Sequence, residues 1–195
     1  SSDNDTFSFS GQDSNARGIF FKPDGTKIYM AGIGSATVYQ YSLSTPWLVS
    51  STSYDNVSFP LQSPTGETSV RDLTFSSDGT KMYIVGSSTD EIFEFDLSTA
   101  WDVSSTSYNN VNLDVSSENG NPTGLTFSTD GTKMFMIGST VPDDVSQYDL
   151  STAWDLSSAT YNNVAFEVTA QEGVPLCVRF NPSGTKMYVC GTQDK

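Results

Sequence analysis

The side chains most able to do chemistry are carboxylates and two arginines in polar segments between short apolar runs. Carboxylates attract cations or a basic partner, and two of them about 5 to 10 Å apart in a pocket could hydrolyse a glycoside. Arg17 and Arg71 each precede an apolar run and could hold a carboxylate or a sugar, although salt bridges to neighbouring loops are the alternative. The candidate binding residues are Asp13, Arg17, Glu67, Arg71, Asp72, Asp90, Glu91, Glu118, Asp143, Asp144 and Glu172.

Neither metal chemistry nor nucleophilic catalysis is indicated by this set. No segment follows the Asp-x-Asp-x-Asp-Gly pattern of a calcium loop, so we expect no metal ligand and no cofactor, with Ca²⁺ as the less favoured alternative. The chain contains no histidine, which removes the commonest general base, the commonest zinc ligand and every Ser-His or Cys-His nucleophile pair. We therefore expect no catalytic residue and no enzymatic activity.

Charge and hydropathy exclude two classes of partner. Nine Lys and Arg residues against 23 Asp and Glu residues give a formal net charge of −14, and such a chain is repelled by phosphate backbones and anionic bilayers. No apolar run approaches the roughly 20 residues that span a membrane, and residues 1–10 lack the basic and apolar regions of a signal peptide. We expect neither nucleic-acid binding nor membrane insertion.

A repeated pattern of about 53 residues sets where these side chains lie. The segment Phe-x-x-Asp-Gly-Thr-Lys begins at Phe21, Phe75 and Phe127, and a variant with Ser-Gly begins at Phe180, so successive copies start 54, 52 and 53 residues apart. A second block, Ser-Thr-x-Trp followed seven residues later by Tyr, recurs three times. A fixed period of this length is typical of architectures in which each repeat is one supersecondary unit.

Each repeat contains four short apolar or alternating runs separated by turn residues, which predicts four antiparallel strands. In the second repeat we expect them over residues 70–75, 81–85, 92–97 and 111–115, with Asp-Gly forming the first hairpin. The second run is apolar on both parities, as a strand covered on both faces requires. The pattern favours an all-β fold, a β-propeller with about four four-stranded blades, over a solenoid, whose rungs are usually shorter.

The strand count predicts an incomplete last blade. We expect a single β-propeller domain over residues 1–195, or part of a larger propeller, with repeats at about 11–60, 61–115, 116–168 and 169–195 and an N-terminal strand over 6–10. This arrangement holds fifteen strands, one fewer than four closed blades need. An unpaired strand edge favours pairing with another chain. We therefore expect self-association or continuation in a longer chain.

The repeat also carries a family resemblance. Its Phe-x-Pro-Asp-Gly-Thr-Lys-Met-Tyr-Val pattern and later Tyr-Asp-Leu-Ser-Thr-Ala-Trp-Asp resemble the WD-repeat-like and YVTN-type β-propellers of prokaryotic surface proteins and of phage-encoded proteins. The resemblance covers nearly the whole chain and implies architecture more than activity, since most such propellers are binding or scaffold modules and a minority are enzymes. The Gly-His pair of the eukaryotic WD type is absent.

The two cysteines and the repeated aromatic residues are interpreted as structural. A hairpin loop over residues 182–185 would place Cys177 opposite Cys190, so a disulfide bond and an oxidising compartment are possible, with buried free thiols as the alternative. The repeated Trp and Tyr residues are expected to pack between blades rather than to stack on sugars. The repeated lysines after each hairpin are expected to pair with turn aspartates.

These observations favour a non-catalytic binding or structural propeller that is extracellular, on a cell surface or part of a virion. We expect the connections between the fourth and first strands, and between the second and third strands, to recognise a protein or glycan ligand, because loops on a rigid scaffold can vary without cost to the core. The alternatives are a propeller enzyme of the lactonase or glycosidase kind that uses loop carboxylates, or a self-assembling structural subunit.

Overall fold

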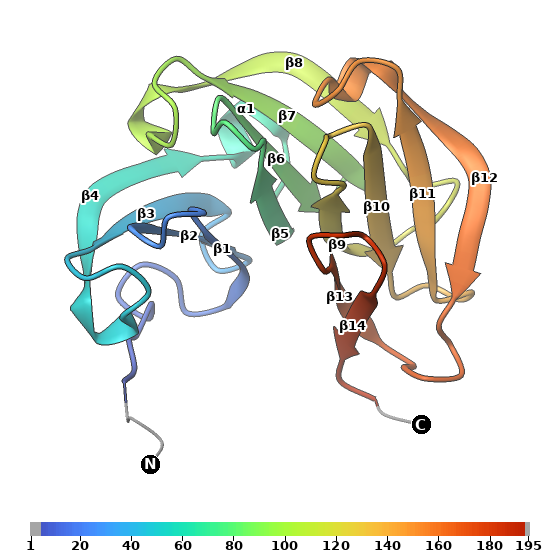
Figure 1. The fold of residues 1–195 in the computed structure, drawn as a ribbon, viewed down its shortest axis with the longest axis horizontal. Coiled ribbons are helices and arrows are strands. Elements are labelled where there is room, and N and C mark those ends of the chain that lie inside the picture. Colours follow the sequence, from blue (N-terminus) through green and yellow to red (C-terminus); the bar gives the residue numbers. More distant parts are fainter. Residues whose placement is uncertain (1–4, 194–195) are drawn as a thin grey trace.

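The computed structural model describes residues 5–193 as an arc of antiparallel sheets, each a blade of a β-propeller (Figure 1). The predicted all-β propeller with an incomplete last blade is confirmed. Blade 1 consists of β1 (Ala16–Phe21), β2 (Lys27–Gly32), β3 (Thr37–Leu43) and β4 (Thr52–Pro60). Blade 2 consists of β5 (Val70–Phe75), β6 (Lys81–Gly86), β7 (Glu91–Leu97) and β8 (Thr106–Asp114). Blade 3 consists of β9 (Pro122–Phe127), β10 (Lys133–Gly138), β11 (Asp144–Leu150) and β12 (Ala159–Glu167). Blade 4 is the hairpin of β13 (Pro175–Phe180) and β14 (Met187–Gly191).

Strands follow chain order within each blade, from the inside of the arc to its outside. The first strands β1, β5, β9 and β13 contact one another in series, and β4, β8 and β12 lie on the outer rim (Figure 1). Short 3₁₀ turns, Val49–Ser51, Val103–Ser105 and Leu156–Ser158, lead into the outer strands, and the single helical turn α1 (Gln62–Thr65) connects blades 1 and 2. The inner strands therefore bring equivalent residues of successive blades together.

The core lies between blades rather than inside any one of them. In β6, Met82 and Ile84 join a buried cluster with blade 1, whereas Tyr83 and Val85 join one with blade 3. Alternate side chains of a strand point to opposite faces, so a strand sandwiched between two blades is apolar at every position. This packing explains the apolar second run that the sequence analysis singled out.

Three details differ from the sequence-based expectations. Residues 6–10 do not form a strand, although Phe9 packs edge-on against Tyr41 as Phe59 of β4 packs against Phe95 of blade 2. The fourth strands begin before the repeated Tyr and are nine residues long, because the 3₁₀ turn after the Trp feeds directly into them. Trp47 is exposed, since in the described residues no blade precedes blade 1 to cover it.

The repeated lysines also pair differently from the prediction. Lys81 contacts Glu94 and lies 3.1 Å from Asp96 on β7, and Lys133 lies 2.5 Å from Asp149 on β11. The lysine follows the hairpin on the second strand, so its side chain reaches the neighbouring third strand rather than the turn. The turn aspartate Asp78 instead accepts the backbone N–H of Thr80 at 3.0 Å.

Candidate functional site

A β-bulge in each inner strand aims one side chain into the centre of the arc. The pairing of β1 with β2 skips Arg17, and the pairing of β5 with β6 skips Arg71 in the same way. The equivalent extra residues are Thr123 in β9 and Leu176 in β13. Such bulges redirect a side chain out of the regular pleat and are common beside active sites.

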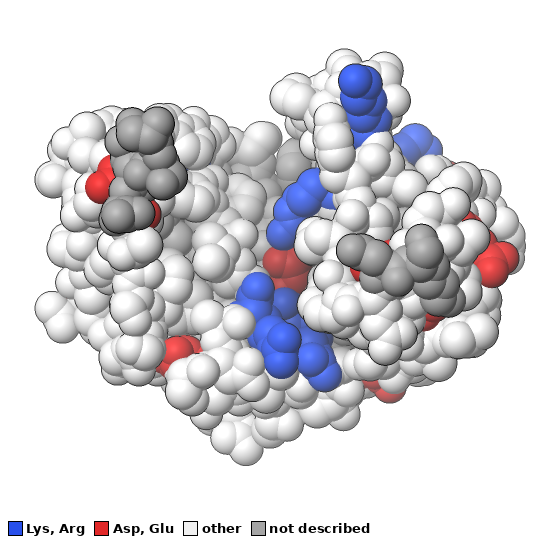
Figure 2. All heavy atoms as spheres, turned by 90° about the horizontal axis from the view of Figure 1, so that it is seen from below, with Lys and Arg blue, Asp and Glu red and all other residues white. Residues whose placement is uncertain are grey.

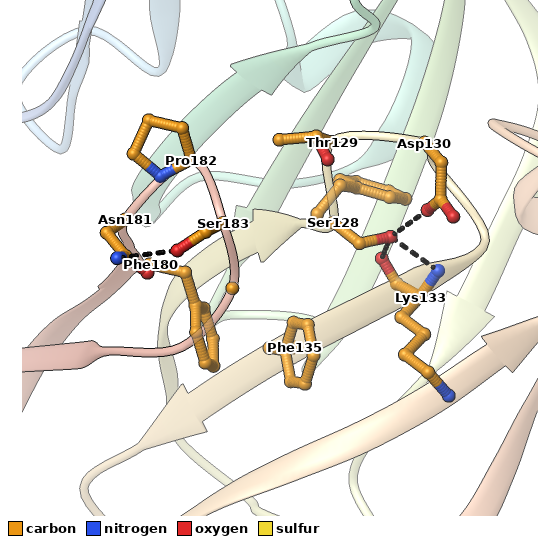
Figure 3. Close-up of a pocket in the computed structure, with 11 residues that line it drawn as sticks. Ser128, Thr129, Asp130, Lys133, Phe135, Phe180, Asn181, Pro182 and Ser183 are labelled. Carbon is orange, nitrogen blue, oxygen red and sulfur yellow. Dashed lines mark hydrogen bonds between the residues drawn. The ribbon is translucent and has the colours of Figure 1, made fainter.

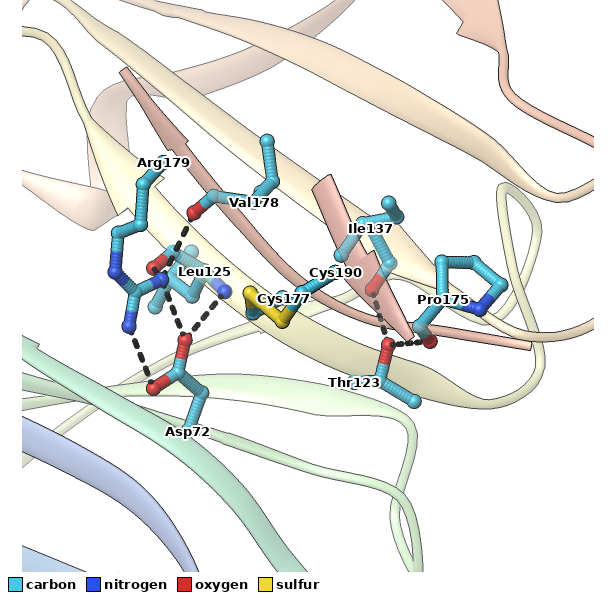
Figure 4. The surroundings of a disulfide bond; sticks show 9 residues. All are labelled: Asp72, Thr123, Leu125, Ile137, Pro175, Cys177, Val178, Arg179 and Cys190. Atoms are coloured by element: carbon cyan, nitrogen blue, oxygen red, sulfur yellow. Dashed lines mark hydrogen bonds and ion pairs between the residues drawn. A yellow bond between two sulfur atoms is a disulfide. The ribbon is translucent and has the colours of Figure 1, made fainter. Parts of the chain in front are cut away.

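The four bulge residues meet at one cavity of about 220 Å³, which Ala16 and the Cys177–Cys190 disulfide also line. Cys177 lies directly opposite Cys190 in the β13–β14 register, and the two are joined by a disulfide bond (Figure 4). The bulge of each inner strand thus contributes one side chain to a shared site. This convergence, and no single motif, defines the candidate functional site.

The cavity is cationic in a strongly acidic chain. Figure 2 shows basic side chains gathered in the hollow of the arc, with acidic atoms beside them. Within residues 5–193, neither Arg17 nor Arg71 forms a salt bridge, and the Arg71 Nε donates to Ser87 Oγ at 2.7 Å. Burial lowers the pKa of Arg71, and the charge of Arg17 lowers it further against the opposing effect of Glu67. An anion held between the two guanidinium groups would relieve this repulsion.

Beside the cavity, one ion pair joins three blades (Figure 4). Arg179 on β13 donates to both carboxylate oxygens of Asp72 on β5, at 2.9 and 3.1 Å. The same guanidinium donates to the Leu125 carbonyl on β9, and Asp72 accepts the Leu125 N–H, each at 3.1 Å. Both oxygens of Asp72 are therefore occupied, so this residue positions the inner strands rather than acting as a free acid or base.

Sequence reasoning missed Arg179 and Thr123, although a comparison of the copies carries a signal for Arg179. Arg179 stands where the other inner strands have Phe20, Thr74 and Thr126. Its partner Asp72 stands where Gly18 and Gly124 are found, at positions where a Cβ would crowd the neighbouring inner strand. Charged residues that replace the repeat's usual small or apolar ones are the signal that could have identified this pair.

Three of the predicted carboxylates have a structural role instead. Asp13, Glu67 and Glu172 occupy the same place in blades 1, 2 and 4, where Asn119 stands in blade 3, and each holds backbone N–H groups of its own blade's loops. Glu67, for example, accepts the N–H of Thr89 at 3.2 Å. Burial would raise the pKa of Glu67, but its hydrogen bonds to Ser88, Ser69 and Thr89 outweigh burial and lower it.

The other five predicted carboxylates also lie outside the cavity lining. Burial raises the pKa values of Asp90 and Asp144, and among the described residues Asp90 and Asp143 each leave one buried oxygen without a hydrogen-bond partner. Glu91 accepts from Asn112, and Glu118 accepts from the Tyr148 hydroxyl at 3.1 Å. In the described part of the chain no three Cys, Asp or Glu residues come together as a metal site. The structure thus unites Arg17 and Arg71, with Asp72 beside them, and disperses the rest.

Comparison with known proteins identifies the class of fold. No family model and no curated protein matches the chain. Among solved structures, it is similar to a candidate 6-phosphogluconolactonase from Bacteroides uniformis (TM-score 0.62, 12% identity, 89% of this chain and 46% of that chain). It is also similar to the Pseudomonas aeruginosa periplasmic gluconolactonase (TM-score 0.60, 16% identity, 90% and 47%) and to the Cps50 (Swd1) β-propeller domain of Myceliophteria thermophila (TM-score 0.57, 11% identity, 92% and 51%).

The chain has a β-propeller-type fold, and it spans about half the length of the structures it resembles. At these identities the similarity establishes the fold alone. The expectation of a non-catalytic binding or structural module is contradicted by the descriptions of these structures, several of which are lactonases, and the descriptions match the propeller-enzyme alternative instead. That expectation took the lack of histidine as evidence against catalysis, whereas a cavity lined by guanidinium groups offers another means of stabilising charge. No described helix is long and apolar enough to cross a membrane.

Proposed function

We propose that this chain forms the substrate-binding part of a lactonase-like propeller that acts on an anionic sugar lactone. The observation that carries the proposal is the convergence of Arg17 and Arg71, from equivalent bulges of adjacent blades, on one cavity without salt-bridge partners in the described residues. Guanidinium groups bind phosphate and carboxylate through paired N–H donors. The descriptions of two similar propellers, a candidate 6-phosphogluconolactonase and a gluconolactonase, support a sugar lactone as substrate, and the phosphate in the first name supports an anionic one.

Hydrolysis of an anionic lactone requires groups that bind the anionic substituent and groups that stabilise the oxyanion. Attack of water on the lactone carbonyl converts its oxygen to an oxyanion, which hydrogen-bond donors fixed in a partly buried site stabilise. One guanidinium group would hold the anionic substituent of the sugar, and the other would face this developing charge. The bond from Arg71 to Ser87 restricts the motion of one of these donors before substrate arrives.

Activation of the attacking water requires a further group. The described lining of the cavity holds no Asp or Glu side chain. We therefore assign substrate binding and oxyanion stabilisation, and not the activation of water, to the residues of this cavity. This division makes substrate binding by the arc separable from hydrolysis.

We further infer that the protein works in an oxidising compartment outside the cytoplasm. The disulfide between Cys177 and Cys190 borders the cavity, and disulfides persist mainly in exported proteins. One similar structure is a periplasmic enzyme. The resemblance of the repeat to prokaryotic surface propellers of the YVTN type supports the same location.

Calorimetric titration of the chain with 6-phosphogluconate, the product of 6-phosphogluconolactone hydrolysis, tests the binding half of the proposal. Saturable binding is expected, weaker binding of uncharged glucose, and at least about a tenfold loss of affinity for Arg17→Gln or Arg71→Gln, since each removes a charge-assisted contact. Lys186→Gln removes one positive charge outside the cavity and serves as the matched control. Arginine variants that bind as tightly as the unmodified chain would overturn the proposal.

A further inference from the structure

In blades 1 to 3, the glycine of the hairpin between the first and second strands lies against a tryptophan ring. A Cβ added to Gly25, Gly79 or Gly131 would overlap an indole ring of the same blade. In each case the backbone N–H of that tryptophan donates to the glycine carbonyl at 3.0 Å. The supported residues are Trp47, Trp101 and Trp154.

Blade 4 has the same hairpin without a tryptophan. Gly184 has φ of 68°, like the 72 to 75° of the other three glycines, and the turn closes with the same bond from the N–H of Asn181 to the Lys186 carbonyl at 3.0 Å. No atom of the described residues, apart from its chain neighbours, lies within 4 Å of a Cβ built on Gly184. The hairpin is thus shaped to support an indole ring that the described residues do not supply.

The walls of this space are already assembled (Figure 3). Phe180 lies 4.5 Å from Phe135 between ring centres, as Phe127 lies 4.5 Å from Tyr83 in the interface that holds Trp154. The two rings and the hairpins of blades 3 and 4 enclose a cavity of about 430 Å³. Figure 3 shows Phe135 and Phe180 lining the space between the two turns.

The strand that would deliver a tryptophan also has its pairing site in place. In blades 1 to 3 the second strand pairs with a third strand whose last residue donates to the hairpin threonine, as Leu97 donates to Thr80 at 2.8 Å. Within residues 5–193, β14 pairs only with β13. Its other edge presents backbone groups to which an extended segment can add, by the strand-addition mode of peptide recognition.

Two side chains of blade 3, Gln147 and Phe166, correspond to residues that contact the next blade's third strand elsewhere in the arc. The side-chain oxygens of Gln40 and Glu94 accept the N–H two residues after the next blade's Trp, at 2.9 and 2.7 Å, and Gln147 holds the equivalent place. On the outer strand, Phe59 packs against Phe95 of the next blade's third strand, whereas Phe166 is 60% exposed. The positions that contact a third strand in the other blades are therefore present along the whole length of this edge.

We propose that the Phe135–Phe180–Gly184 pocket and the free edge of β14 together bind an extended segment with the third-strand pattern of a further repeat, Tyr-Asp-Leu-Ser-Thr-Ala-Trp. Its Trp fills the space over Gly184, its Tyr covers Phe166, and the N–H two residues beyond the Trp donates to Gln147. This assignment concerns a polypeptide-binding site on the outer part of the arc and does not depend on the arginine cavity.

A labelled peptide with the sequence of residues 144–158 tests the assignment, because it contains the Tyr, the Trp and the residues after it. Fluorescence anisotropy with the 195-residue chain is expected to show saturable binding, and replacing the peptide's Trp by Ala should weaken it at least about tenfold. Equal binding of the two peptides, or no binding of either, would overturn the proposal.

Chain variants locate the binding site. Gly184→Ala places a methyl group where the indole would lie and is expected to reduce binding at least about tenfold. Gly66→Ala, at another glycine with positive φ and open space around it, imposes a similar backbone strain away from the pocket and should leave binding unchanged. Phe135→Tyr restores the hydroxyl with which Tyr29 and Tyr83 reach the Trp carbonyl and should tighten binding about three- to tenfold. Unchanged binding by Gly184→Ala would also overturn the proposal.

Discussion

Arg179 on the last inner strand reaches past its neighbour β9 to form a two-point ion pair with Asp72 on β5. The pair crosses the inner strand of blade 3, and the Leu125 backbone between the two side chains bonds to both of them. The Asp72 side chain is 5% exposed and that of Arg179 is 41% exposed, so the carboxylate bears most of the cost of burial. The contact fixes how far the inner strands of three blades can separate.

Removal of Arg179 is expected to destabilise the chain. Arg179→Met keeps the apolar stem but leaves Asp72 buried without its charged donor, which should cost about 1 to 3 kcal/mol of unfolding free energy. Urea denaturation measures this change. In a double-mutant cycle with Asp72→Asn, the second substitution should cost much less once Arg179 is gone. Additive effects of the two substitutions would contradict a direct coupling.

A buried hydroxyl of blade 2 bonds across the interface to blade 3. Tyr83 is fully buried, and its OH donates to the Trp154 carbonyl at 2.5 Å. Tyr83→Phe leaves that carbonyl without this partner and should lower the unfolding free energy by about 1 kcal/mol. The matched control is Tyr188→Phe, since Tyr188 occupies the same place in β14 but is 57% exposed. Thermal unfolding should separate the two variants, and similar shifts in both would argue against the interface role.

Glu67 makes stability depend on pH in a defined direction. Its pKa is lowered from 4.5 because hydrogen bonds from Ser69, Ser88 and Thr89, in two loops of the same blade, outweigh burial. The folded state therefore binds this proton less readily than the unfolded state, so the stabilisation is present above about pH 4.5 and is lost as pH falls through the lower folded pKa. We expect Glu67→Gln to lower the melting temperature at pH 7, with the gap to the unmodified chain narrowing as pH falls below 4.5.

Asp90 provides the opposite case within the same blade. Burial, and then the charge of Glu67, raise the pKa of Asp90 above 3.8, so ionisation of Asp90 opposes folding as pH rises through that value. Asp90→Asn should raise the melting temperature at pH 7 and have little effect near pH 3. Asn suits the position because Asp90 has φ of 55°, a conformation that Asn tolerates well. A loss of stability at pH 7 would contradict the assignment.

The disulfide is expected to stabilise blade 4. Cys177 and Cys190 are 13 residues apart, and closing a loop of this length in the unfolded chain is worth about 3 kcal/mol in the chain-entropy model. The double variant Cys177→Ser with Cys190→Ser should unfold at lower urea concentration than the oxidised chain. The unmodified chain treated with reductant should follow the double variant. A midpoint unaffected by reduction would show that the bond contributes little.

Much of the fold can be predicted from the sequence, because the same turn residues and apolar runs occur in each copy of the repeat. The Asp-Gly hairpin and the doubly apolar run at residues 82–85 fix a strand pair and its burial on both faces. The hairpin at residues 182–185 likewise fixes the register that sets Cys177 opposite Cys190. Local turn chemistry and side-chain period suffice for these predictions.

The candidate site was less predictable, because it depends on how blades meet rather than on any one blade. Arg17 and Arg71 were singled out by their equivalent positions, but their convergence with Thr123 arises from bulges that change the strand pairing by one residue. The carboxylates Asp13 and Glu67 resemble ligand-binding groups in sequence, whereas their oxygens bind nearby backbone N–H groups. Side-chain composition cannot distinguish these two roles.

The bulges have a consequence for how such a protein could diversify. A residue that the strand ladder skips has no paired residue on the neighbouring strand, so substitutions at Arg17, Arg71 and Leu176 change no register pair of their sheets. Thr123 is more constrained, because its hydroxyl donates to the carbonyls of Ile137 and Pro175 at 3.2 and 2.9 Å. The blades can therefore keep the same folding pattern while the residues at the bulge positions change to suit a new ligand. In this architecture, stability and ligand selectivity depend largely on different positions of the same repeat.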